Sequence, residues 1–154
     1  MRENMRHVPE TVERSLDSTL ESVDSAEELA VSLAERAGVD EDELMKVGMA
    51  IRECMVNAVV HGNRYNANKK VRFTVAANAE HFTVKIADEG EGFDFDAVPD
   101  PLAPENLLKT SGRGIFLIRS FMDDVKIHPS STGTEIKLIK HVHGMTEGGK
   151  EASQ

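Results

Sequence analysis

The feature that most constrains the fold is a change in the spacing of apolar residues along the chain. Up to about residue 62, they recur every three or four positions, which is the period of an amphipathic helix. From Val71 onward they alternate with polar residues, which is the period of a strand with one buried face. Elements of these two kinds hide their apolar faces by packing on each other. We therefore predict an α+β fold, a two-layer sandwich with helices on one face of a mixed, mainly antiparallel sheet.

Local signals place the boundaries of the elements. Ser18 and Glu21 have the spacing of a capping box, Gly38 is suited to end that helix, and Asp40 is suited to cap the next one. The predicted helices lie at 18–37, 40–62 and 114–122, and the predicted strands at 12–17, 71–75, 82–87, 125–128 and 135–139. A hairpin turn is predicted at 78–81. The long segment 88–111 lacks these patterns, and long loops in compact domains are usually functional or disordered.

Composition limits the classes of function. The 154 residues suit one domain, which we place at 12–140 between flexible ends at 1–11 and 141–154. The net charge of −9 argues against direct binding to nucleic acid or to anionic membranes, and it suits a basic partner. Cys54 is the single cysteine, so an internal disulfide is impossible and a cytoplasmic location is expected. No apolar run approaches the ~20 residues that cross a bilayer.

The second predicted helix carries polar residues at regular spacing inside the stretch ECMVNAVVHGN. Four residues advance a helix by about 400°, so Glu53, Asn57 and His61 are expected to form one stripe beside the apolar face. A carboxylate, an amide and an imidazole placed so regularly suggest a polar site. The alternative is an ordinary solvated helix face.

Three glycine-containing motifs follow, and each is weak when taken alone. Asp88-Glu89-Gly90-Glu91-Gly92 comes directly after a predicted strand, where glycines let the backbone approach a ligand closely. Ser111-Gly112-Arg113-Gly114 opens a predicted helix, where free backbone N–H groups favour an anion. Thr132-Gly133-Thr134 precedes the last predicted strand. As isolated motifs, all three are also ordinary turns.

Taken in order, these motifs and the 53–62 segment resemble the nucleotide-binding domain of the GHKL superfamily, which includes gyrase and the histidine kinases. Within it the chain is most similar to the anti-sigma-factor serine kinases of bacterial partner-switching systems. The likeness spans about 12–140 and rests on 53–62, 88–92, 111–118 and 121–125. It implies the GHKL (Bergerat) ATP-binding fold, with ATP and Mg²⁺ as ligands.

The resemblance also implies roles for individual residues. Asp88 would accept a hydrogen bond from the adenine amino group, Thr134 would assist at the base, and Gly90 and Gly92 would let the backbone pass close to the nucleotide. Asn57 would hold Mg²⁺ through its amide oxygen, and an oxygen ligand suits this cation. His61 belongs to the same nucleotide-binding stripe, although a capping role at the helix end is the alternative.

Phosphate chemistry is implied for the remaining residues. Glu53 would be the general base that takes a proton from a serine hydroxyl or a water. Gly112 and Gly114 would cradle phosphate oxygens with backbone N–H groups. Arg113 and Lys109 are the nearby cations that would neutralise phosphate charge. The segment 95–111 would close over the nucleotide as a lid.

The implied activity is ATP-dependent phosphorylation of a serine on an anti-anti-sigma protein, combined with sequestration of a sigma factor. The resemblance favours a homodimer. A nucleotide-binding partner switch without phosphotransfer is the main alternative, because Lys109 is the only basic residue in PDPLAPENLLKTS. The catalytic half of a histidine kinase fits less well, since no dimerisation helix pair with an acceptor histidine precedes Asp40.

Overall fold

The computed structural model describes residues 10–90 and 114–142. The predicted loop beyond Gly90, the lid, and most of both predicted flexible ends lie outside these residues.

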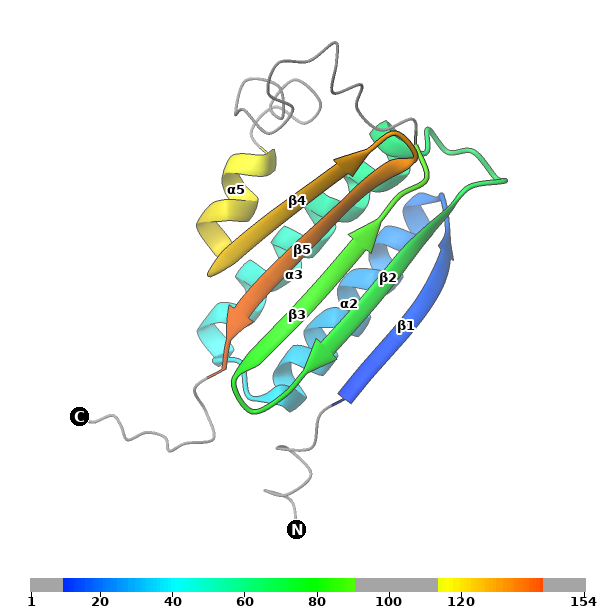
Figure 1. Ribbon diagram of the computed structural model, residues 1–154. Helices are drawn as coiled ribbons and strands as arrows, with labels where there is room; N and C mark the ends of the chain where they lie inside the picture. The colour runs from blue at the N-terminus through cyan, green and yellow to red at the C-terminus, as the bar shows by residue number, and fades with distance from the viewer. Residues whose placement is uncertain (1–9, 91–113, 143–154) are drawn as a thin grey trace, which may run out of the picture.

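One layer of the molecule is a five-stranded sheet (Figure 1). Its strands are β1 (Glu10–Asp17), β2 (Lys70–Ala77), β3 (His81–Ala87), β4 (Asp124–Ser130) and β5 (Gly133–His141). They lie in the order β1-β2-β3-β5-β4, and each neighbouring pair is antiparallel. The predicted strands are confirmed, but the described sheet contains no parallel pair, so "mixed" was too broad.

The other layer consists of helices on one face of that sheet, as predicted. These are α2 (Leu20–Ala37), α3 (Glu41–Val56) with a π-helical extension η1 (Asn57–Gly62), and α5 (Gly114–Phe121). Figure 1 shows α2 and α3 running behind the sheet, with α5 beside β4. Every second residue of the central strands is buried against them, and the largest fully buried side chains include Phe73, Phe82, Ile51 and Met55. The apolar residues that alternate in the sequence therefore form a single core between the two layers.

The predicted cap of the first helix was wrong by one residue. Thr19 is the N-cap, and its hydroxyl accepts a hydrogen bond from the backbone N–H of Ser22 at 3.3 Å. Ser18 is buried at the end of β1, where its hydroxyl donates to the Lys69 carbonyl oxygen at 2.5 Å. Gly38 ends α2 in the left-handed conformation, with φ of 103°, as expected. Asp40 precedes α3, but its side chain makes no capping hydrogen bond.

Candidate functional site

The candidate site is centred on Asp88, which directly follows β3. Its Oδ1 accepts hydrogen bonds from the backbone N–H of Gly90 at 2.9 Å and of Thr134 at 3.2 Å. The backbone N–H of Asp88 donates in turn to the Thr134 carbonyl oxygen at 3.0 Å. Burial raises the pKa of the Asp88 carboxyl, and the two backbone donors and the charge of Lys69 oppose that rise. The structure thus joins two residues predicted for the base, Asp88 and Thr134, and leaves Oδ2 of Asp88 without a partner among the described residues.

Three glycines from separate segments allow the close packing of the backbone around Asp88. A Cβ atom on Gly62, at the end of η1, would lie 2.5 Å from the Asp88 carboxylate. A Cβ on Gly90 would collide with the Gly62 carbonyl, and one on Gly133 would collide with the Asp88 carbonyl. Gly133 also has a φ of 150°, which side chains rarely adopt. The close approach of these backbones forms the compact wall of the candidate site.

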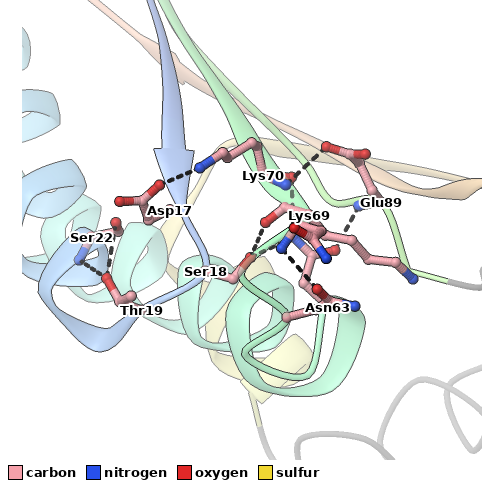
Figure 2. Close-up of polar contacts among 10 residues, drawn as sticks. Asp17, Ser18, Thr19, Ser22, Asn63, Lys69, Lys70 and Glu89 are labelled. Carbon is pink, nitrogen blue, oxygen red and sulfur yellow. Dashed lines mark hydrogen bonds and ion pairs between the residues drawn. The ribbon is translucent and has the colours of Figure 1, made fainter.

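Asn63 fixes the turn that carries Asp88, and sequence reasoning missed it. This residue is 2% exposed and lies just beyond η1. Its Oδ1 accepts from the Glu89 backbone N–H at 2.7 Å, and its Nδ2 donates to Ser18 Oγ at 2.9 Å and to the Lys70 carbonyl oxygen at 3.0 Å. Figure 2 shows this side chain between the ends of three strands. The only signal in the sequence was an asparagine directly after the final glycine of the helix.

The end of the second helix differs from the prediction. At Asn57 the α-helix widens into the π-helix η1, and the Asn63 N–H bonds to the Ala58 carbonyl oxygen, five residues back. The 100° step of an α-helix therefore stops applying before His61. Glu53 and Asn57 are half-buried, whereas His61 is exposed. The π-helical turn changes the direction of His61 relative to the one that an α-helix would give, and the shared stripe of the three residues stays a prediction.

Asn57 carries an unusual atom. Its side-chain oxygen Oδ1 is buried and has no hydrogen-bond partner within residues 10–90 and 114–142. A buried amide oxygen without a partner costs free energy, on the order of 1–3 kcal/mol. An oxygen in this state is available to a cation or to a hydrogen-bond donor of a ligand. The donor set therefore fits an oxygen-seeking cation such as Mg²⁺, although no cluster of three or more His, Cys, Asp or Glu residues suited to a metal occurs in 10–90 and 114–142.

The predicted phosphate-binding part of the site lies largely outside the described residues. Gly92, Lys109, Gly112 and Arg113 all lie in 91–113. Gly114 is the first residue of α5, so the predicted glycine motif does open a helix. The description of the site is thus confined to the base-binding wall and to Glu53 and Asn57.

Comparison with known proteins identifies the class of domain. Residues 16–140 match the family model of the histidine kinase-like ATPase domain. Because the match covers most of the chain, the chain belongs to that family. The fold agrees: the structure of the histidine kinase domain of a blue-light activated kinase from Erythrobacter litoralis superposes with a TM-score of 0.55 at 15% identity, over 82% of this chain and 63% of that one.

Individual relatives show which members of the family this chain resembles. The chain is 30% identical to the serine-protein kinase RsbW of Bacillus subtilis over 118 residues, 73% of each protein. It is 37% identical to the anti-sigma F factor of the same organism over 106 residues, 66% of this chain and 71% of the relative. The structure of the RsbU and RsbW domains of a Mycobacterium tuberculosis protein superposes with a TM-score of 0.62 at 16% identity, over 85% of this chain and 32% of that one. The predicted resemblance to anti-sigma-factor kinases is confirmed.

The lengths and hydropathy of the described helices were compared with those of membrane spans. Among the described residues, no helix is both long and apolar enough to cross a membrane.

Proposed function

We propose that this chain is an ATP-dependent protein serine kinase of the anti-sigma-factor type. Its family is an ATPase domain, and relatives that match most of its length are named serine-protein kinase and anti-sigma factor. The observation that carries the proposal is the Asp88 carboxylate, which accepts hydrogen bonds from two backbone N–H groups and packs against Gly62.

Adenine recognition is assigned to Asp88 and its surroundings. The Gly90 and Thr134 N–H groups occupy Oδ1, so Oδ2 remains to accept a hydrogen bond from the adenine amino group. Thr134 lies against Asp88 and would contact the base edge. Gly90 and Gly92 would let the flat ring approach the backbone. A fixed acceptor in a partly buried place selects an amino group over a carbonyl, because an unpaired carboxylate beside a carbonyl is costly.

A magnesium ion is assigned to Asn57 and the nucleotide phosphates. The unpartnered Oδ1 of Asn57 supplies the protein ligand. When bound, Mg²⁺ neutralises phosphate charge and orients the phosphates. His61, which is exposed at the end of η1, is assigned a secondary place at the nucleotide.

Phosphotransfer is assigned to Glu53 together with the predicted phosphate-binding residues. Glu53 lies one helical turn before Asn57 and is half-buried. As the serine oxygen of the substrate bonds to the γ-phosphorus and ADP leaves, Glu53 would accept the hydroxyl proton. Gly112 and Gly114 would bind phosphate oxygens through N–H groups, and Lys109 and Arg113 would offset the developing charge.

Partner exchange follows from charge. The proposed partners are a sigma factor, an anti-anti-sigma protein that receives phosphate on a serine, and a second copy of the chain. A phosphoserine adds about −1.5 to −2 charge at neutral pH. Because this chain already has a net charge of −9, the phosphorylated product is repelled and the kinase is free to hold the sigma factor. The proposed compartment is the cytoplasm.

Phosphate transfer from ATP tests the proposal. The purified chain is incubated with radiolabelled ATP, Mg²⁺ and each candidate anti-anti-sigma protein of the same organism. We expect label on one serine, and its loss with Glu53→Gln while ATP binding is kept. If ATP binds and no candidate receives label, the chain is a nucleotide-dependent partner switch without phosphotransfer, and the kinase assignment is wrong.

A further inference from the structure

The face of the sheet opposite the helices carries a row of three lysines. The strand register places Lys85 of β3 directly opposite Lys137 of β5, and Lys137 directly opposite Lys126 of β4. Their neighbours along each strand are buried against the helices, so these three side chains point the other way. Lys85 and Lys126 are exposed, and Lys137 is half-buried. In Figure 1 this face is turned toward the viewer, and no described helix covers it.

This arrangement is unfavourable within the free protein. Like charges directly opposite on neighbouring strands destabilise a sheet. None of the three lysines forms an ion pair with another described residue, although the chain has more acidic than basic residues. Basic residues elsewhere do form ion pairs: Arg52 pairs with Asp24 and Glu27 on α2, at 2.8 and 2.6 Å. The lysine row is therefore a local concentration of positive charge that forms no ion pair with the described residues.

A hollow lined by both acidic and basic residues lies at one end of the same face. The next row of the register includes Arg72 of β2 and His128 of β4, both exposed. These two residues line an open hollow of about 910 Å³, together with the β4–β5 turn, the Asp88 turn and the acidic residues Glu89 and Glu135. The Asp88 carboxylate itself faces Gly62 in the helical layer. Asp88, Gly90 and Thr134 also line this hollow, so its wall is shared with the candidate nucleotide site, whereas the lysine row lies further along the sheet.

We propose that this face is a docking surface for an acidic segment of a partner protein. Glu13 of β1 occupies the edge of the lysine row, and Glu135 lies between Arg72 and His128 in the next row. The basic area is therefore small and bounded by acids, which suits a few carboxylates of a polypeptide. The continuous phosphate charge of a nucleic acid would meet the acidic edge and the net charge of −9. This inference does not depend on phosphotransfer.

The test compares two variants with equal loss of charge. One replaces the row (Lys85→Gln, Lys126→Gln, Lys137→Gln), and the control replaces three basic residues of the helical layer (Arg36→Gln, Lys46→Gln, Arg119→Gln). A labelled poly-glutamate peptide is titrated into each at low salt, with a single-stranded oligonucleotide and anionic vesicles as comparators. If each exposed pair contributes a factor of about two, the row variant binds the peptide about tenfold more weakly than wild type. The control stays within twofold.

A second readout separates docking from a structural role. Because the row repels itself, the row variant should unfold at a urea concentration equal to or above that of wild type. Lower stability would overturn the inference. It is also overturned if the peptide does not bind, if both variants weaken binding equally, or if the oligonucleotide or vesicles bind more tightly. The inference is also overturned if wild type is a dimer and the row variant is a monomer, because the face would then bind a second copy of the chain.

Discussion

Replacing Asn63 tests how the candidate site is held in place. Asn63→Ala removes two donated hydrogen bonds and one accepted hydrogen bond at a side chain that is 2% exposed. The partners left behind are Ser18 Oγ, the Lys70 carbonyl oxygen and the Glu89 N–H. At about 1 kcal/mol for each bond, the free energy of unfolding should fall by about 3 kcal/mol. For a chain of this size that is a drop in Tm of roughly 9 °C.

The matched control is Asn78→Ala. The Asn78 side chain accepts two short hydrogen bonds, from the N–H groups of Glu80 and His81, both at 2.8 Å. It lies in an exposed hairpin where water replaces it, so we expect a loss of less than about 1 kcal/mol. Urea unfolding measures both variants, and ATP titration should show weaker binding for Asn63→Ala alone because the Asp88 turn is released. Equal losses of stability in the two variants would refute the positioning role of Asn63.

Three further predictions use the same assays. Gly62→Ala places a methyl group against the Asp88 carboxylate, so stability should fall by about 1–3 kcal/mol and ATP should bind more weakly; unchanged ATP affinity would contradict the close approach. Asn57→Ala should abolish the gain in ATP affinity on adding Mg²⁺ without lowering stability, because the amide oxygen is unpartnered; a variant that keeps the full Mg²⁺ effect would remove Asn57 as ligand. The hydrogen bond from Lys140 lowers the pKa of Glu43. This contact therefore stabilises the fold at pH values above the ordinary glutamate pKa, and its contribution disappears as the pH falls through the lowered pKa. The difference in unfolding free energy between wild type and Lys140→Met should therefore shrink on acidification, and a constant difference from pH 7 to strongly acidic pH would be the contrary result.

The layers of the fold were predictable because burial leaves a periodic trace in the sequence. Alternation at Val71, Phe73 and Val75 gave a strand, and all three residues face the helices. Gly38 gave a helix end because only a residue without a Cβ atom adopts φ of 103° at low cost.

What escaped prediction depends on contacts between distant residues. Ser18 satisfies the spacing of a capping box, yet its hydroxyl bonds to the carbonyl of Lys69, fifty-one residues away, and Thr19 takes the cap. The π-helical turn after Val56 leaves no periodic trace, so the sequence predicted an α-helix through His61 where the structure has η1. The anchoring by Asn63 arises only once β1, β2 and the Asp88 turn meet.

The most direct test of the account is calorimetric titration of ATP with Mg²⁺ into wild type and Asp88→Asn. The amide oxygen of the variant can still accept from Gly90 and Thr134, while its NH₂ group faces the adenine amino group, donor against donor. Burial raises the pKa of Asp88, so the free energy of unfolding falls as the pH rises through the raised pKa and the buried carboxyl ionises. The uncharged variant should therefore be at least as stable as wild type at pH 7. We predict that wild type binds ATP and that the stable variant binds it roughly 100-fold more weakly, a loss of about 2.7 kcal/mol. Equal affinities in the two proteins would contradict the assignment of adenine to Asp88.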